Sequence, residues 1–436
     1  MDPMLVTGLA ISLIFIFMAI GTPVFAALGL SGIFGVMMLE DLNFVIHKLQ
    51  AMPYYQSADY LLTVIPLFIL MGAFVHHSGI GETLFGLARK WVGHMPGGLA
   101  MASILTCAGF AATSGSSVAT SATVGAVAIP EMKKAGYDSS LSAGAVAAGG
   151  VLGVLIPPSV LLVFYAALTE VSAGKMLIAG IIPGLLSTFI FIIGIRLIAK
   201  KVQNKASVAE KESWKNRFLS LKDAWQITIL FIVVLGGIYA GIMTPTEAAA
   251  IGTLCAFFML LFSKKGRQNF RRKFYESCRS SITTTVMIMI TMIGAGIFSY
   301  FLNLAQIPQL LSGLIANSGI SGTLVIVLFL ILYFPLGMFL DAFSMLVITL
   351  PIMFPTVKAL GFDPIWFGIL AVKMCEIGLI TPPVGLNIFV IAGIDRETPL
   401  TKIFVGAWWF VLMEIFTLTL LFYFPLLTTW LPAHTR

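Results

Sequence analysis

The sequence predicts an all-α protein that crosses a membrane many times and consists of two related halves. Hydrophobic residues make up 58% of the 436 residues and charged residues only 10%, and the mean hydropathy is +1.00. Such a chain has more apolar surface than a water-soluble core can bury, and apolar stretches long enough to cross about 30 Å of hydrocarbon recur along it. The second observation is an internal repeat. No extended polar region interrupts the chain, so we expect one polytopic membrane domain.

The repeat relates residues that lie 225 positions apart, as Pro157 and Pro158 do to Pro382 and Pro383. The other first-half members are Pro130, Lys133, Gly136, Asp138, Gly153, Leu161, Phe164 and Ala167, which recur as Pro355, Lys358, Gly361, Asp363, Gly378, Leu386, Phe389 and Ala392. Each half contains three apolar spans, a stretch with a polar tip, a span interrupted by two prolines, and a final span. If the polar-tipped stretch re-enters on the side that it left, each half crosses five times. An odd number makes the two repeats inverted, which places a binding site between them at the midplane.

Two basic loops orient the predicted spans. Residues 200–222 and 264–279 are rich in Lys and Arg, so both loops are expected in the cytoplasm. Counting spans outward from them places both termini, including Arg436, in the periplasm. The first apolar stretch, residues 5–20, follows an acidic residue and lacks a cleavage site, so we expect a retained span rather than a signal peptide. The net charge of +7 lies in short loops between spans and does not indicate nucleic-acid binding.

The first polar tip consists of Ser114, Gly115, Ser116 and Ser117, between apolar arms at residues 99–110 and 118–130. Neither arm is long enough to cross the membrane with the polar centre intact. Irregular backbone at membrane depth persists only where protein buries it or where it lines a wet cavity, so we expect a re-entrant hairpin. The alternative is one continuous helix whose small residues allow close packing.

The second polar tip lies in residues 334–344 and contains Asp341, which the 225-residue shift aligns with Ser116. A carboxylate inside an apolar hairpin costs several kcal/mol unless it is paired or binds a cation, so Asp341 is a candidate functional residue. The alternative is a structural carboxylate that caps a half-helix.

The two Pro-Pro pairs each interrupt an apolar span. Two consecutive prolines remove two amide donors and clash with the preceding turn, so each helix is expected to open there. The carbonyls left without partners can coordinate a dehydrated Na⁺, and the restarted half-helix directs its positive end at an anion. A simple kink is the alternative, but matched pairs in both halves favour a functional break.

Several other residues carry weaker signals. Lys373 and Glu376 lie one helical turn apart before the second break, where they either neutralise each other or take part in binding. His76 and His77 end an apolar span and are expected to be interfacial. The four cysteines match no metal or redox spacing. The chain has no zinc-binding His-Glu-x-x-His sequence, no aspartate-rich diphosphate motif and no paired nucleophile and base, so we expect no enzyme activity.

These motifs resemble the large membrane subunit (M subunit) of the tripartite ATP-independent periplasmic (TRAP) transporters, over essentially the whole chain. They are residues 114–117, 129–132 with 136–138, 155–159, 337–341 and 376–387. The resemblance implies an elevator-type ion transporter fold and Na⁺-driven uptake of a small organic acid anion, such as a C4-dicarboxylate or sialic acid, through the bacterial inner membrane. It implies two partners, a small four-helix membrane subunit and a periplasmic substrate-binding protein. Na⁺ is the only metal implied, and no other cofactor is.

The resemblance also implies roles for single residues and for segments. Those implied to bind Na⁺ are Ser114, Gly115, Ser116, Ser117, Pro157, Asp341, Gly378, Thr381 and Pro382. Those implied to contact the substrate are Pro158, Ser159, Pro383, Gly385 and Asn387. A moving transport domain is expected at residues 99–167 and 322–393, and a scaffold at residues 1–98, 168–321 and 394–436.

Two other functions fit the same pattern less well. A stand-alone Na⁺-coupled dicarboxylate or citrate symporter of related fold would need no binding protein, and uptake by the chain alone would favour it. A channel is the other alternative, but repeated broken helices suit gated binding better than a continuous pore.

Overall fold

The computed structural model describes residues 2–202 and 211–435, and within these residues every regular element is a helix. Two sequence predictions extend beyond them, because residues 203–210 of the basic loop at 200–222 and Arg436 at the C-terminus lie outside the described residues.

The helices of each half follow in the order that the sequence predicts, with short additional helices between them. The first half contains α1 (Pro3–Ala19), α2 (Val24–Leu39), α3 (Leu42–Leu49), α4 (Met52–Ser57), η1 (Tyr60–Thr63), α5 (Val64–Ser78), α6 (Ile80–Val92), α7 (Gly98–Ser114), α8 (Ser117–Lys134), α9 (Ser139–Leu155), α10 (Val160–Thr169), α11 (Ala173–Ala179) and α12 (Ile181–Val202). The second half contains α13 (Trp214–Ser220), η2 (Leu221–Ala224), α14 (Trp225–Phe231), η3 (Ile232–Gly236), α15 (Gly237–Tyr239), α16 (Pro245–Phe262), α17 (Lys264–Arg267), α18 (Phe270–Leu304), α19 (Ile307–Ser318), α20 (Gly322–Gly337), α21 (Ala342–Ala359), α22 (Pro364–Gly378), α23 (Leu386–Ile394), α24 (Leu400–Tyr423) and α25 (Leu426–Ala433).

Corresponding helices of the two halves begin at matching residues. The α8 and α21 helices are each 18 residues long, and their bounds differ by the shift of the sequence repeat. The next helices, α9 and α22, start after Asp138 and Asp363, whose carboxylates each accept two backbone amides of the first turn. A side-chain acceptor at this position satisfies amides that a helix leaves free at its start. The repeat seen in the sequence therefore extends to the helix caps.

Among the described residues, seven helical segments are long and apolar enough to cross a membrane, and the bent pair α9 and α10 makes an eighth. The seven are Tyr60–Ser78, Ala173–Ala199, Trp214–Tyr239, Pro245–Phe262, Phe270–Leu304, Ala342–Ala359 and Leu400–Tyr423. Four shorter apolar helices, α1, α2, α7 and α20, account for further parts of the predicted spans and hairpins. The prediction of an all-helical polytopic protein is confirmed, whereas five crossings per half remains a prediction.

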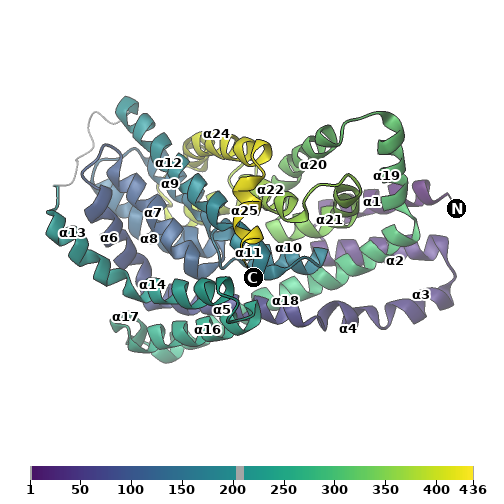
Figure 1. The fold of residues 1–436 in the computed structure, drawn as a ribbon, viewed down its shortest axis with the longest axis horizontal. Helices are drawn as coiled ribbons and strands as arrows, with labels where there is room; N and C mark the ends of the chain where they lie inside the picture. The colour runs from purple at the N-terminus through teal and green to yellow at the C-terminus, as the bar shows by residue number, and fades with distance from the viewer. Residues whose placement is uncertain (1, 203–210, 436) are drawn as a thin grey trace.

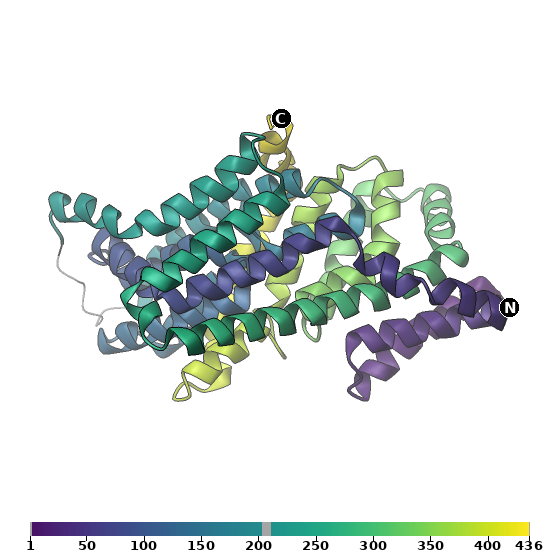
Figure 2. The ribbon, with the colours of Figure 1, turned by 90° about the horizontal axis from the view of Figure 1, so that it is seen from below.

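The helices pack as two groups. In the α5 group, α5 packs against α16 and α18, and α2 packs against α1 and α18. These long helices run side by side across the face seen in Figure 2 and along the lower edge of Figure 1. Glycine allows close contacts here, because a Cβ at Gly32 of α2 would lie 2.9 Å from the Phe298 Cα of α18. Small residues at such crossings let helix backbones approach each other in a membrane.

The α9 group contains the hairpins and the interrupted helices. The α9 helix packs against α7, α8 and α24, the α12 helix packs against α7 and α24, and α22 packs against α20 and α21. Two glycines allow the backbones of α9 and α24 to approach closely, since a Cβ at Gly144 of α9 would lie 2.4 Å from the Gly406 carbonyl carbon of α24. Thus α12 packs with the first hairpin, and α24 packs with the interrupted helices, rather than either packing mainly with the α5 group.

Candidate functional site

The first polar tip is a tight link between two helices. The α7 helix ends at Ser114, Gly115 adopts φ +61, and Ser116 is the N-cap of α8, with its hydroxyl accepting the Ala119 amide at 3.3 Å. A left-handed residue with no Cβ lets the chain reverse within two residues. The expected interruption between two helices is confirmed, and the alternative of one continuous helix is wrong, whereas re-entry on the same side of the membrane remains a prediction.

The second tip has the same design with a carboxylate in place of the serine. The α20 helix ends at Gly337, and Asp341 is the N-cap of α21. Its carboxylate accepts the backbone amides of Phe343 and Ser344 at 3.0 and 3.3 Å, together with the Ser344 hydroxyl. The capping role is therefore present in the structure. Asp341 can have a second role besides capping, because its half-buried side chain also lines a cavity.

Both Pro-Pro pairs lie where a helix opens, as the sequence predicts. The first break separates α9 from α10, whose axes differ by 43°, and the second separates α22 from α23. The Pro157–Pro158 and Pro382–Pro383 peptide bonds are both cis. The helix after the first break, α10, has Ser159 as its N-cap, and the Ser159 hydroxyl accepts the Leu162 amide at 3.2 Å. The helix after the second break, α23, follows Gly385, which has φ +58.

Each tip packs against the break of its own half. A Cβ at Gly115 would lie 2.8 Å from the Pro158 carbonyl oxygen, so the first tip touches the first break through backbone atoms. In the second half, a Cβ at Gly378 would lie 2.6 Å from the Gly337 Cα. The carbonyl ends of α20 and α22 therefore meet at two glycines. At the end of α22 the carbonyl oxygens of Cys375, Glu376, Ile377 and Gly378 already accept backbone amides of Leu379, Ile380 and Thr381. A carbonyl oxygen has two lone pairs, so one that accepts a single hydrogen bond can still bind a cation.

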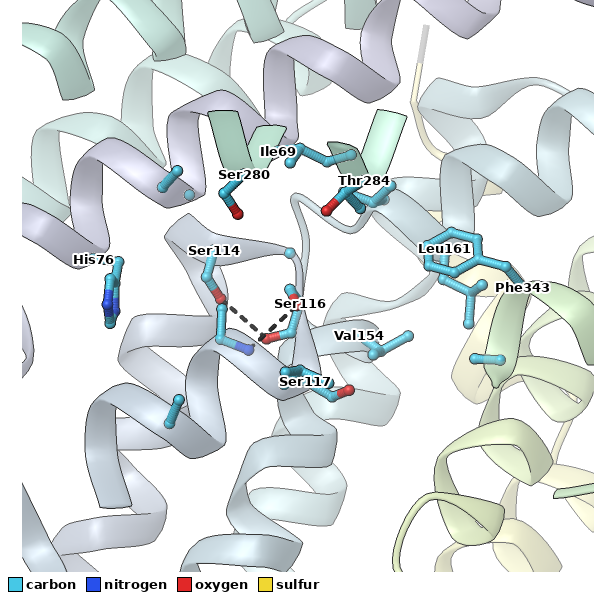
Figure 3. Close-up of a pocket in the computed structure, with 18 of the residues that line it drawn as sticks. Ile69, His76, Ser114, Ser116, Ser117, Val154, Leu161, Ser280, Thr284 and Phe343 are labelled. Atoms are coloured by element: carbon cyan, nitrogen blue, oxygen red, sulfur yellow. Dashed lines mark hydrogen bonds between the residues drawn. The ribbon is translucent and has the colours of Figure 1, made fainter. Parts of the chain in front are cut away.

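One cavity of about 480 Å³ joins the two tips and the two breaks. The first tip contributes Ser114, Gly115, Ser116 and Ser117, and the second contributes Asp341, Ala342 and Phe343. Val154, Val160 and Leu161 line it from beside the first break, and Leu379 and Leu386 from beside the second. The remaining wall comes from α5 and α18 of the α5 group and from Val118, Ala119 and Ala122 of α8. Figure 3 shows the serines of the first tip facing Ser280 and Thr284 across this space, with Phe343 to one side.

The cavity wall includes five of the residues predicted to bind an ion or substrate, namely Ser114, Gly115, Ser116, Ser117 and Asp341. The others do not line the cavity and lie within or just beyond the breaks, where Pro382 and Pro383 are exposed. These other residues are Pro157, Pro158, Ser159, Gly378, Thr381, Pro382, Pro383, Gly385 and Asn387. Asn387 is fully buried and its side-chain amide donates to the Ala147 carbonyl at 3.4 Å, while the Thr381 hydroxyl donates to the Ile377 carbonyl at 2.6 Å.

The structure adds four polar side chains that the sequence did not single out as ligands. His76 and His77 end α5, and Ser280 and Thr284 lie on α18, and all four line the cavity. His76 also forms a hydrogen bond through Nδ1 with the Thr123 hydroxyl of α8, so it joins the α5 group to the first hairpin. Nothing in the spacing of these residues connects them with the tips, because they come from helices packed against the hairpins from outside.

The cavity offers helix starts rather than basic side chains to an anion. The α8, α10, α21 and α23 helices all begin at the tips or breaks that surround it, and neither Lys nor Arg is found among its described lining residues. A helix start presents free amides and the positive end of the helix dipole, each contributing about 0.3–1 kcal/mol toward a nearby anion. Four such starts and several hydroxyls suit a small carboxylate or sulfonate.

Lys373 and Glu376 form the expected charge pair, but away from the cavity. Their side chains are 3.1 Å apart and fully buried on α22. Two partners were not predicted: Glu414 of α24 forms a second ion pair with Lys373, and Ser187 of α12 accepts a hydrogen bond from it at 2.8 Å. The pair is therefore part of a cluster that ties three helices of the α9 group together.

A second ion pair joins the first hairpin to the end of the second broken helix. Lys133, in the last turn of α8, contacts Asp395, which follows α23, at 2.5 Å, and Asp395 also accepts the Thr398 hydroxyl. Burial alone would raise the pKa of the Asp395 carboxyl, but the hydrogen bonds from Lys133 and Thr398 outweigh it and hold that pKa below its ordinary value of 3.8. The Lys133 pKa is raised above 10.5, since its hydrogen bonds with the Asp395 and Glu397 carboxylates outweigh the effect of burial.

We expect Lys133→Met to lower the free energy of unfolding by about 1–3 kcal/mol, because it leaves the buried Asp395 carboxylate without its charged donor. The Asp395 contribution is present above pH 3.8 and is lost as the pH falls through the lowered pKa, whereas the Lys133 contribution persists until the pH rises through the raised pKa. Stability curves of the protein and variant should therefore differ throughout the neutral range and converge in acid. Thermal unfolding in detergent at several pH values measures this.

Lys134→Met is the matched control, because the Lys134 side chain is 75% exposed and its one ion pair within the described part of the chain is with Glu131 of the same helix. An exposed pair of this kind contributes about 0–1 kcal/mol. Equal losses of stability in the two variants would contradict a structural role for the Lys133 pair.

The sequence matches the family model described as "Tripartite ATP-independent periplasmic transporter, DctM component" over residues 11–427. Among curated proteins, it is 37% identical over 410 residues to a C4-dicarboxylate TRAP transporter large permease protein DctM of Pseudomonas aeruginosa, covering 93% of each chain. It is 35% identical to the protein of the same name from Vibrio cholerae, covering 98% of each chain. It is 30% identical to the sialic acid TRAP transporter large permease protein SiaM of Vibrio cholerae, covering 86% of each chain.

The fold is similar to that of a solved structure, the Alcanivorax borkumensis YdaH transporter. The TM-score is 0.59 with 16% sequence identity, and the match covers 88% of each chain. At this identity the likeness concerns the fold alone.

Proposed function

Because the chain belongs to the DctM component family of TRAP transporters, we propose that it carries a small organic acid anion through the inner membrane by Na⁺-coupled secondary transport. The family resemblance seen in the motifs is thereby confirmed, and the curated relatives are permeases rather than enzymes. The observation that carries the proposal is the single cavity lined by both polar tips and flanked by both helix breaks. C4-dicarboxylates and sialic acid, which the relatives' names give, are the first substrates to test.

In this proposal Na⁺ binds beside the tips and breaks. One group of ligands comes from Ser114 to Ser117 and the break at Pro157, and the other from Asp341 and the break that includes Gly378, Thr381 and Pro382. The contact of each tip with its own break supports two separate ion sites. Ion binding orders the tips, and the ordered helix starts then bind the anion.

The proposed substrate contacts differ from those expected from the sequence, because the expected residues do not line the cavity. We propose that they act through the helix starts: Ser159 caps α10, Gly385 precedes α23, and Asn387 holds the first turn of α23 against α9. Pro158 and Pro383 set the breaks that create these starts. The residues that contact the substrate directly in this proposal are the serines of the first tip together with Ser280 and Thr284.

The proposed transport movement is of the elevator type, in which one group of helices slides against another. Two inverted repeats of five spans each would build both groups. The hairpins and broken helices, residues 99–167 and 322–393, form the moving part and the α5 group forms the scaffold. We also assign α12 and α24 to the moving part, because they pack against α7, α9 and α22, although the sequence suggested that residues 168–321 and 394–436 are scaffold.

Two protein partners belong to the proposal, as the word tripartite in the family description suggests. A small four-helix membrane subunit would enlarge the scaffold, and a periplasmic substrate-binding protein would deliver the anion to the cavity. Both chain termini would lie on the periplasmic side.

Uptake into liposomes tests the function. The chain, reconstituted with the small subunit and supplied with the cognate binding protein, should take up the labelled acid under a Na⁺ gradient and not under a K⁺ gradient of equal size. Leaving out the binding protein should reduce uptake to background. Full uptake by the chain alone would instead support the stand-alone symporter, and uptake without a Na⁺ gradient would reject ion coupling.

A further inference from the structure

The buried cluster on α22, α24 and α12 contains two carboxyl groups and one basic group. Lys373, Glu376 and Glu414 are all 0% exposed, and one ammonium group faces two carboxylates. Glu376 Oε1 and Glu414 Oε1 are buried and have no hydrogen-bond partner among the residues that the structure describes. If both glutamates were ionised, one carboxylate charge would be uncompensated in the interior of the protein.

Among the residues that the structure describes, no other charge near the cluster removes this imbalance. The helices packed against α22 and α24 include α9, α23 and α25, which contain no ionisable residue. The α12 helix contributes the Ser187 hydroxyl, and its Arg196 is exposed. On α11, Lys175 is exposed, and Lys402 of α24 itself is exposed as well.

The remaining neighbours are neutral or face elsewhere. Tyr165 of α10 donates its hydroxyl to the Pro364 carbonyl, and Tyr333 of α20 forms a hydrogen bond with the Thr349 hydroxyl of α21. Lys358 of α21 lies over the Phe354 ring, and Asp341 lines the cavity. Cys375, next to Glu376, is a buried thiol.

We propose that the cluster binds one proton in addition to the lysine's own, so that one glutamate is a neutral carboxylic acid and Lys373 pairs with the other as carboxylate. The proton comes from water and forms an O–H bond at a carboxylate oxygen. An unpaired buried charge costs several kcal/mol, and a group in that position takes up a proton instead. A Na⁺ ion is the less suitable ligand, because it needs several oxygen donors and would sit beside an ammonium group.

The added proton makes the cluster electrically neutral. This charge balance involves Lys373, Glu376 and Glu414 alone, so the inference does not depend on the proposed function or on which Na⁺ sites the transporter uses. Neutrality matters for helices that lie within the hydrocarbon layer, where a net charge is strongly unfavourable. It also explains how Glu376 can lie one turn before the second break without attracting a coupling ion away from the cavity.

Infrared spectroscopy of the full-length protein in lipid tests the assignment, because the C=O stretch of a protonated carboxyl lies apart from the amide and carboxylate bands and shifts on deuteration. At neutral pH we expect Glu414→Gln and Glu376→Gln each to lose one carboxyl equivalent from this band, since Lys373 then pairs with the single remaining carboxylate. Lys373→Met should gain one equivalent, because both glutamates must then be protonated. The double variant Lys373→Met/Glu414→Gln should return to the intensity of the unmodified protein.

Glu397→Gln is the control, because this carboxylate is 88% exposed and should leave the band unchanged. If Lys373→Met does not fold, the carboxyl band intensities of Glu414→Gln and Glu376→Gln are sufficient to test the proposal. An unchanged band in both of them would show that both glutamates are ionised and would overturn the proposal. A band that appears only when Na⁺ is replaced by choline would overturn it as well, in favour of a Na⁺ site.

Discussion

Asp341→Asn is expected to shift Na⁺-dependent uptake to much higher Na⁺ concentrations while leaving the protein folded. Asparagine caps a helix about as well as aspartate, so α21 should keep its start, but the anionic ligand is lost. Losing a charged ligand costs about 1.5–3 kcal/mol, which corresponds to a roughly 10- to 150-fold weaker apparent Na⁺ affinity. The measurement is uptake by proteoliposomes as a function of Na⁺ concentration, alongside thermal unfolding of the purified variant.

Asp363→Asn is the matched control for this variant. Asp363 caps α22 through the amides of Ile365 and Trp366, as Asp341 caps α21, but it is exposed and does not line the cavity. It should retain normal Na⁺ dependence. If Asp341→Asn transports normally and only Asp341→Ala fails, the carboxylate acts as a cap, and the proposed ion role is wrong.

Gly378→Ala is expected to reduce uptake at least about tenfold, because the added Cβ has no space. It would lie 2.6, 3.2 and 3.3 Å from the Cα, carbonyl carbon and carbonyl oxygen of Gly337. All three are backbone atoms, so no side-chain rotation relieves the contact. Overpacking of this kind costs about 1–3 kcal/mol, and here it separates the second tip from the second break. Initial uptake rates and thermal unfolding together measure the effect.

Gly393→Ala provides the comparison, because Gly393 lies on the half-helix that follows the same break and has nothing within 4 Å of a Cβ position. Alanine should be tolerated there and stabilise α23 by about 0.5–1 kcal/mol. Normal transport by Gly378→Ala would mean that the close contact of the two helix ends is dispensable, and the proposed second ion site would have to be abandoned.

Local chemistry explains why so much of the site was predictable from the sequence. Consecutive prolines cannot continue a helix, Gly115 reverses the chain at φ +61, and Ser116 and Asp341 cap the helices that follow. These effects act within a few residues, so they appear in the sequence as motifs. The 225-residue repeat then identified both copies of each motif, and the bounds of α8 and α21 follow the same shift.

The sequence by itself determined the all-helical membrane fold, the two hairpins, the two breaks and the family. Only the tertiary structure decided that both tips open into one cavity, that Ser280 and Thr284 close it, and that Glu414 joins Lys373 and Glu376. The physical reason is that backbone interruptions depend on neighbours in the chain, whereas side-chain partners depend on which helix faces meet. The glycines that set those approaches, such as Gly144 against Gly406, carry no signal of their partner.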